Sequence, residues 1–353
     1  MLRLPPFRFV RPDSPQEAAR VLAGEGSRAQ LVAGGTDLWP KMKRRQMAPA
    51  TVIGLQHLSQ LHTMEGSPQR GISLGANWTL RELEGHPLLL EHYPAVAQAA
   101  RSISSPPLKT MATLGGNLCL DTRCNYYDQT YEWRKSIDFC MKKEGEICWV
   151  APSSPRCWAV TSTDLAPVML ALDARIHLLS SQGERVIAAQ DLYADDGIRY
   201  LSKRPDEILT RVDLPPVNGD RTAFLKLRRR GSIDFPILNV ALRVRPGQDG
   251  RVCQEIRIAI GAVSSRPFLA EQAQLALQGQ PLDDERIEEA ARLCFKAARP
   301  LDNTDLNFSW RHKMVPVYVR RALQEVAASM KEEGIRSQES GIRKRDLESG
   351  TLD

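Results

Sequence analysis

One segment, from Cys119 to Trp158, constrains this chain more than any other. Regular apolar spacing disappears there, and cysteines with 15, 7 and 8 residues between them take its place at Cys124, Cys140, Cys148 and Cys157. A segment without an apolar stripe or alternation has little means of building its own hydrophobic core. Because thiolates are soft ligands, four of them in one segment suit either zinc or an iron–sulfur cluster.

The cysteine spacing leaves both metals open. Structural zinc usually uses a close C-x(2–4)-C pair, which this segment lacks, and the spacing also differs from the commonest ferredoxin patterns. Aromatic residues are concentrated in the same segment, at Tyr126, Tyr127, Tyr131, Trp133, Phe139, Trp149 and Trp158. A dense apolar shell protects an iron–sulfur cluster from water and helps to set its potential. The aromatic residues therefore favour a cluster, and a small satellite core around structural zinc is the alternative.

The expected cellular location of the chain and its net charge limit the classes of function that it can have. The residues at the N-terminus do not resemble a signal peptide, and no apolar run reaches the length of a transmembrane helix, so we expect a cytoplasmic protein. In a reducing compartment, clustered cysteines indicate metal or redox chemistry rather than disulfides. The net charge of +6 comes from 48 basic and 42 acidic residues that are interspersed. We therefore expect a mixed surface with neither a nucleic-acid nor a membrane partner.

The first part of the chain reads as a small α/β unit. Ser14 has the character of a helix N-cap, with Pro15 in the first turn and Glu17 completing a capping box. Strands are expected at residues 30–33 and 51–55, and the unit ends near residue 57. A second unit over residues 58–214 mixes strands and helices, and it contains the four-cysteine segment at about residues 119–158.

The rest of the chain reads as a separate domain. A linker rich in proline and glycine follows at residues 215–219. Strands are then expected at residues 222–228, 238–244 and 252–262, followed by two helices, the first of them capped by Asp283 or Asp284. This order predicts an α+β domain over residues 219–330, with helices on one face of an antiparallel sheet. The charged residues 331–353 are predicted to be a disordered tail.

Two glycine pairs are candidates for binding an anion. Gly34-Gly35 lies in LVAGGTDL and Gly115-Gly116 in MATLGGNL, each after a strand-like stretch. Paired glycines allow consecutive backbone N–H groups to approach an anion such as a diphosphate closely. A tight turn without a ligand is the alternative for each pair. Neither pair fits the dinucleotide fingerprint G-x-G-x-x-G or the P-loop, which argues against a Rossmann or NTPase fold.

Four segments together resemble the FAD-binding medium subunit of the xanthine dehydrogenase and carbon monoxide dehydrogenase family. They are LVAGGTDL at residues 31–38, TLGGN at 113–117, STDLAP at 162–167 and LKLRRRGSIDFPILNVA at 225–241. The resemblance extends from about Met1 to Met330. Within that family, the four-cysteine insertion is similar to that of the 4-hydroxybenzoyl-CoA reductase flavoproteins, where it holds a 4Fe-4S cluster.

The resemblance implies a set of cofactor-binding residues and no catalytic residue. The first segment would wrap the FAD diphosphate, with the amides of Gly34, Gly35 and Thr36 as donors. Asp164 would hydrogen-bond the adenosine side of FAD, and Lys226 would reach toward the isoalloxazine, where a cation stabilises reduced flavin. The complete implied set is Leu31, Val32, Ala33, Gly34, Gly35, Thr36, Asp37, Leu38, Ile103, Thr113, Leu114, Gly115, Gly116, Asn117, Asp164, Leu209 and Lys226, with Cys124, Cys140, Cys148 and Cys157 on the 4Fe-4S cluster.

The implied fold is α+β, with a two-part FAD-binding domain that carries the cluster insertion and a smaller C-terminal α+β domain. The implied function is electron transfer within 4-hydroxybenzoyl-CoA reductase. Its partners would be a molybdopterin-binding large subunit and a 2Fe-2S small subunit in a dimer of heterotrimers, with ferredoxin as donor. Two alternatives remain: the same subunit of another molybdenum hydroxylase acting on a related aromatic or heterocyclic substrate, and a zinc-stapled interaction protein without a redox role.

Overall fold

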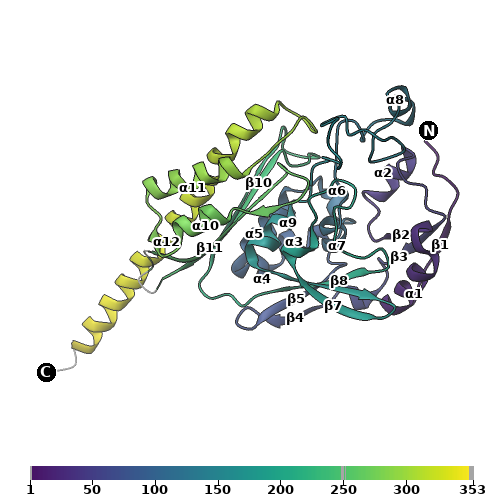
Figure 1. The fold of residues 1–353 in the computed structure, drawn as a ribbon. Coiled ribbons are helices and arrows are strands. Elements are labelled where there is room, and N and C mark those ends of the chain that lie inside the picture. The colour runs from purple at the N-terminus through teal and green to yellow at the C-terminus, as the bar shows by residue number, and fades with distance from the viewer. Residues whose placement is uncertain (1, 248–249, 251, 350–353) are drawn as a thin grey trace.

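Three β-sheets, each with its own helices, succeed one another along the molecule (Figure 1). The computed structural model describes residues 2–247, 250 and 252–349, with side chains as far as Lys331. The N-terminal elements lie at one end of the view and the C-terminal helices at the other, with the second sheet and its helices between them. This order matches the expected α+β architecture.

The first sheet is parallel, with the strand order β1-β3-β2. Its elements are β1 (Arg8–Val10), α1 (Pro15–Glu25), a 3₁₀ turn (Gly26–Arg28), β2 (Ala29–Val32), α2 (Leu38–Lys43) and β3 (Thr51–Gly54). The Ser14 hydroxyl accepts a hydrogen bond from the Glu17 amide at 3.1 Å, which confirms the predicted N-cap. The capping box is not formed as predicted, because the Glu17 carboxylate accepts from the amide of Asp13 and not from that of Ser14. The chain leaves β2 directly into the first glycine pair, so this sheet positions the predicted diphosphate loop.

The second sheet is antiparallel, with the strand order β4-β5-β8-β6-β7. Its strands are β4 (Met64–Ser67), β5 (Gly71–Gly75), β6 (Arg175–Ser180), β7 (Gly183–Ala188) and β8 (Ile208–Leu214). The elements around it are 3₁₀ turns at Ser59–Leu61 and Ala189–Leu192, and α3 (Leu80–Gly85), α4 (Pro87–His92), α5 (Pro94–Ser102), α6 (Pro106–Lys109), α7 (Leu114–Leu118) and α9 (Leu165–Leu172). All eight residues of α9 are buried, because this apolar helix also packs against the third sheet.

The third sheet is the predicted C-terminal α+β unit. Its elements are β9 (Arg221–Leu227), β10 (Leu238–Pro246), β11 (Val252–Gly261), β12 (Phe268–Leu269), α10 (Glu271–Leu277), β13 (Gln280–Pro281), α11 (Asp284–Ala297) and α12 (Phe308–Ser349). The three predicted strands pair antiparallel, and Asp283 caps α11. The sequence did not predict α10 or the two short strands, which are too brief to carry a clear apolar period.

The four-cysteine segment is irregular apart from one short helix, α8 (Tyr131–Ser136). Arg123 and Val160 exchange two backbone hydrogen bonds of 2.8 and 2.7 Å, which hold the two ends of the segment together. The Arg134 side chain is buried and donates to the carbonyl oxygens of Arg44 and Arg45, just after α2. The segment is therefore fixed to the first subdomain as well as to the second.

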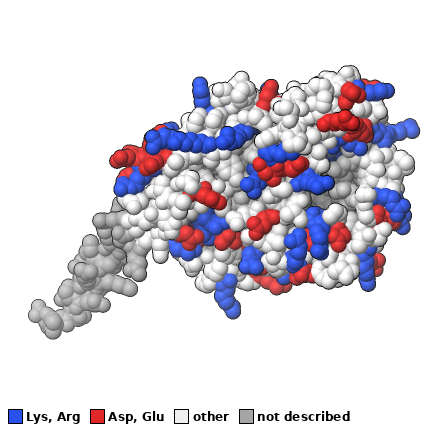
Figure 2. Space-filling model, viewed as in Figure 1, with Lys and Arg blue, Asp and Glu red and all other residues white. Residues whose placement is uncertain are grey.

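The C-terminal helix differs from the prediction. The backbone of α12 is helical to Ser349, where the sequence predicted a disordered tail from residue 331, and residues 350–353 lie outside the described ones. The sequence there is poor in apolar residues but rich in glutamate, lysine and arginine, which are good helix formers. None of the helices in the described part of the chain is long and apolar enough to cross a membrane. Acidic and basic side chains intermingle on the face shown in Figure 2.

Candidate functional site

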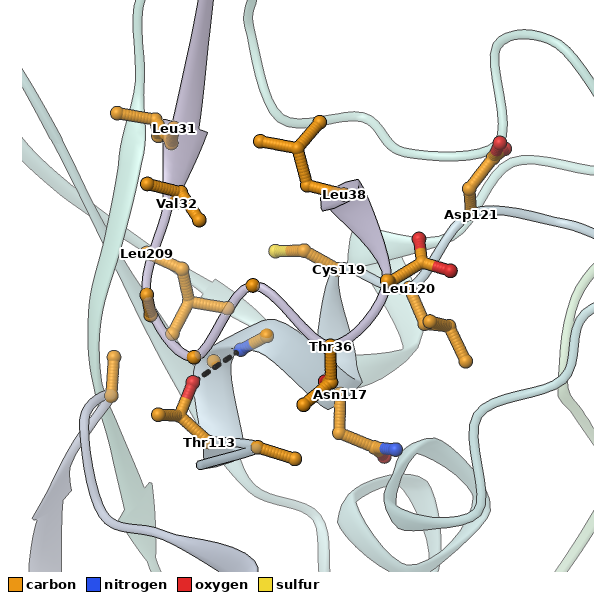
Figure 3. Close-up of a pocket in the computed structure, with 18 of the residues that line it drawn as sticks. Leu31, Val32, Thr36, Leu38, Thr113, Asn117, Cys119, Leu120, Asp121 and Leu209 are labelled. Carbon is orange, nitrogen blue, oxygen red and sulfur yellow. Dashed lines mark hydrogen bonds between the residues drawn. The ribbon is translucent and has the colours of Figure 1, made fainter. Parts of the chain in front are cut away.

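A pocket of about 560 Å³ lies where the first two subdomains meet, and residues of the C-terminal unit reach its edge. The predicted residues that line it are Leu31, Val32, Ala33, Gly34, Gly35, Thr36, Asp37, Leu38, Ile103, Thr113, Gly115, Gly116, Asn117, Asp164 and Leu209. Figure 3 shows the first loop passing from Val32 to Leu38 along one side of the pocket, with Thr113 and Asn117 of the second segment below it. The structure thus brings together 15 of the 17 predicted residues, which come from positions between 31 and 209 of the sequence.

The first glycine pair leaves no room for side chains. A Cβ on Gly34 would lie 1.7 Å from the carbonyl oxygen of Met111, and a Cβ on Gly35 would lie 2.0 Å from the indole nitrogen of Trp39. Gly35 also has a φ of +70°, which glycine adopts without strain. Within the part of the chain that the structure describes, the amides of Gly34, Gly35 and Thr36 donate to no protein acceptor. These three N–H groups are therefore free for an anionic ligand, as predicted for a diphosphate.

The backbone amides of the second glycine pair, unlike those of the first, donate to acceptors within the protein. The amide of Gly115 donates to the carbonyl oxygen of Ala76 at 2.8 Å, and the amide of Gly116 donates to the Thr113 hydroxyl at 3.1 Å. The amides of Leu114 and Asn117 are likewise used within the protein. Gly115 is needed for packing, because its Cβ would lie 2.8 Å from the Ala76 side chain. This segment lines the pocket as the closely packed first turn of α7. Its backbone amides are not free to bind an anion, contrary to the prediction made from its glycine pair.

Asp164 and Lys226 form a buried ion pair at the pocket wall. The Lys226 ammonium donates to the Asp164 carboxylate at 2.8 Å, and Asn239 donates to the other carboxylate oxygen at 3.2 Å. Burial raises the pKa of Asp164, and the charge of Lys226 offsets part of that rise. Asp164 lines the pocket, whereas Lys226 and Leu114 do not. The structure therefore places the two side chains in direct contact at one point of the pocket wall, whereas the resemblance gave them separate contacts along FAD.

Several lining residues were not predicted from the sequence. They include Cys119, Leu120, Asp121, Arg123, Tyr200, Lys203, Ile233, Asp234 and Phe235. Asp121 and Arg123 follow closely after the second glycine segment, and this position was the signal that could have identified them. Tyr200 and Lys203 precede β8 in a stretch without a motif, so no comparable signal exists for them.

The four cysteines of the irregular segment meet in one buried site. Cys124, Cys140 and Cys157 belong to one apolar cluster with Tyr127 and Ala159, and Cys148 is buried beside them. The Cys157 thiol hydrogen-bonds Cys148, which lowers the pKa of Cys148 and raises that of Cys157. Burial raises the pKa of Cys124 to about 12, a rise to which the neighbouring thiols of Cys140 and Cys148 also contribute.

Backbone N–H groups point at these sulfur atoms. Cys124 has the amides of Tyr126 and Tyr127 near its sulfur, and the amide of Ala159 donates to the Cys157 sulfur at 3.4 Å. Cys148 has three such amides, those of Val150, Ala151 and Trp158. N–H donors favour the thiolate form, so the environment suits metal-bound sulfur. Among the described residues, no three His, Cys, Asp or Glu side chains lie close enough together to hold one metal ion.

Comparison with known proteins identifies the family of the chain. Residues 5–217 match the family model of the FAD binding domain in molybdopterin dehydrogenase, and residues 222–326 match that of the CO dehydrogenase flavoprotein C-terminal domain. The aldehyde oxidoreductase FAD-binding subunit PaoB of Escherichia coli is 30% identical over 280 residues, which cover 77% of this chain and 86% of that protein.

Two further proteins are similar over nearly the whole chain. The nicotine 6-hydroxylase medium subunit of Paenarthrobacter nicotinovorans is 27% identical over 328 residues, covering 93% of this chain and 99% of that one. A chain of the crystal structure of Cu,Mo-CO dehydrogenase is 25% identical, with a TM-score of 0.76, and the match covers 92% of this chain and 99% of that chain. Because these relatives are subunits of oxidoreductases, the alternative of a zinc-stapled interaction protein without a redox role is set aside. The chain therefore belongs to the molybdenum hydroxylase family, as the FAD-binding subunit of an oxidoreductase.

Proposed function

We propose that this subunit carries electrons between a 4Fe-4S cluster, held by Cys124, Cys140, Cys148 and Cys157, and FAD, within a reductase of aromatic acyl-CoA thioesters of the 4-hydroxybenzoyl-CoA reductase type. The single observation that carries the proposal is the burial of all four cysteines in one site. FAD suits a junction of this kind because it exchanges one or two electrons.

The chemistry of the donor set fits a cluster. The thiols are buried in an apolar cluster that includes Tyr126 and Tyr127, and backbone N–H groups point at the sulfurs of Cys124, Cys148 and Cys157. Hydrogen bonds to sulfur and exclusion of water are two of the factors that set the reduction potential of a cluster. A four-iron cube also holds its thiolates farther apart than a single ion does, since the cube itself lies between them.

The first glycine loop supports the flavin end of the path. Its three free amides are available for the diphosphate, and Asp164, which Lys226 contacts, supplies a polar group elsewhere on the pocket wall. The names of the relatives, a medium subunit and an FAD-binding subunit, support partner chains for this one. We propose a molybdopterin-binding large subunit and a 2Fe-2S small subunit in a dimer of heterotrimers, with reduced ferredoxin as donor and a cytoplasmic location.

A second substrate class is favoured by one observation. The similarity to a nicotine 6-hydroxylase medium subunit extends over 93% of this chain. The alternative is therefore the same electron-transfer role in a molybdenum hydroxylase that acts on an aromatic heterocycle. The substrate binds elsewhere in such an assembly, so only turnover by the complete complex separates the two candidates.

The test is anaerobic isolation of the complete complex, followed by flavin, iron and acid-labile sulfide analysis. We expect FAD and four iron atoms with four sulfides in this chain. Cys140→Ser should remove that iron and retain FAD at saturating concentration, whereas the matched Cys294→Ser, at a buried cysteine in α11, should keep both. Native protein with flavin but without iron and sulfide would contradict the cluster. Turnover of a heterocycle and of no aromatic CoA thioester would favour the second class.

A further inference from the structure

A chain of buried charges connects the flavin pocket with the four-cysteine site. The Lys41 ammonium, from α2, lies 2.8 Å from the Asp37 carboxylate and 2.7 Å from that of Asp121. The other Asp121 oxygen lies 2.8 Å from the ammonium of Lys142, which is placed in the sequence between Cys140 and Cys148. Asp121 thus receives one cation from the first subdomain and one from the cysteine segment.

Water is nearly excluded from this chain of charges except at Asp37, whose side chain is 27% exposed. The side chain of Lys41 is 1% exposed, and those of Asp121 and Lys142 are 6% exposed. Burial alone would raise the pKa of Asp121, but Lys142 and Lys41 outweigh it and hold the pKa at about 2. Removing one partner of such a group leaves an uncompensated buried charge, which costs far more than loss of a surface pair. The position of each charge therefore constrains its neighbours.

Each end of the chain of charges belongs to one of the two sites. Asp37 and Asp121 both line the pocket, and Asp37 directly follows the amide of Thr36 on the diphosphate loop. At the other end, the hydrogen bond with Cys148 and burial raise the pKa of Cys157, and the nearby charge of Lys142 offsets part of that rise; the Lys142 ammonium also donates to the Gly197 carbonyl oxygen. Gly197 packs so tightly on Cys157 that a Cβ would lie 2.6 Å from the sulfur.

We propose that Asp121, held between Lys41 and Lys142, is a positioning residue that couples the flavin pocket to the four-cysteine site, so that a cofactor in one site tightens binding in the other. The inference rests on the proposed function, because it requires FAD and a cluster in one chain. A ligand on the first loop fixes Asp37 and Lys41, and through Asp121 it fixes Lys142 beside Cys157. Coupling of binding is reciprocal, so the cluster must strengthen FAD binding by the same factor.

The experiment is a double-mutant cycle on the full-length chain, isolated without oxygen. The dissociation constant of FAD is measured by flavin fluorescence in four proteins: native, Cys140→Ser, Asp121→Asn and the double variant. We expect loss of the cluster through Cys140→Ser to weaken FAD binding about fivefold or more when Asp121 is present. In the Asp121→Asn background, Cys140→Ser should change the constant by less than about twofold. The rate of iron loss to a chelator, with and without FAD, should show the same pattern.

Matched variants separate coupling from general damage. Asp220→Asn breaks a carboxylate–Arg245 pair of 2.9 Å in the C-terminal unit and should leave the coupling intact. Lys142→Arg keeps the cation and should retain the coupling, whereas Lys142→Gln should abolish it, which provides a second test if Asp121→Asn does not fold. If Cys140→Ser changed the dissociation constant of FAD by the same factor in the native background and in the Asp121→Asn background, the coupling would be overturned. The proposed function would still stand in that case, provided that the native protein contains iron and flavin. Native protein without iron would overturn both.

Discussion

At the scale of single residues, we expect the first glycine pair to decide how tightly FAD binds. Gly34→Ala would drive a methyl group into the carbonyl oxygen of Met111, and the loop cannot move away without displacing the free amides of Gly35 and Thr36. We expect this variant to fold and to lose at least about tenfold in FAD affinity, which is roughly 1.4 kcal/mol.

Flavin fluorescence titration measures this loss, and Gly183→Ala is the matched control. Gly183 is the first residue of β7 in the second sheet, and a Cβ there would meet open space. Its φ of +131° makes the control variant strained in the backbone, so it should lose stability but keep FAD affinity. Unchanged affinity in Gly34→Ala would mean that the diphosphate does not lie on this loop.

Asp121 should also give the protein a defined acid sensitivity. Its folded-state pKa of about 2 is below the usual value of 3.8, so the ionised form stabilises the folded protein. This contribution, on the order of 2 kcal/mol, is fully present above pH 4 and is lost as the pH falls toward 2. Asp121→Asn should therefore lower the free energy of unfolding at pH 7 and pH 5 alike, and the difference from the native protein should shrink only below pH 4. Urea unfolding across this range measures the difference, and a gap that closes near pH 6 would implicate another group.

At the scale of elements, the cysteine segment depends on its contact with α2. Arg134, from α8, donates to the carbonyl oxygens of Arg44 and Arg45, and its side chain is buried. Arg134→Met keeps the length and apolar stem of the side chain but removes these donors. We expect faster amide exchange over residues 41–46 and 131–136 and easier loss of iron, with unchanged exchange in β9–β11. Lys135→Met, at an exposed neighbour, should alter neither.

Sequence patterns predicted the regular elements of this fold better than its site. The cap at Ser14, the strands of the third sheet and the irregularity around the four cysteines are local properties, and the structure has them all. The two glycine pairs look alike in sequence, yet only the first has free amides, because the Ala76 carbonyl and the Thr113 hydroxyl accept those of the second. Ala76 comes from a distant segment, and no local period of the sequence reveals such a partner. The Asp164–Lys226 contact escaped prediction for the same reason.

At the scale of the whole molecule, the C-terminal end of α12 should be dispensable for the fold. The buried residues of this helix that the structure describes run from Arg311 to Met330, where they pack on the third sheet. A chain shortened after Lys331 should therefore bind FAD as the full chain does and melt within about 3 °C of it. Calorimetry with flavin analysis measures both. A chain shortened before Val319 should unfold, because it loses core residues of that sheet.

The walls of the pocket are drawn from residues between Leu22 and Phe235, and this span has a consequence for biosynthesis. The ribosome must complete about two thirds of the polypeptide, and the first two sheets must meet, before any hollow for the cofactor exists. Flavin therefore enters a nearly finished protein and cannot act as a nucleus for its early folding. In a cell short of riboflavin, the product to look for is a folded subunit that lacks FAD.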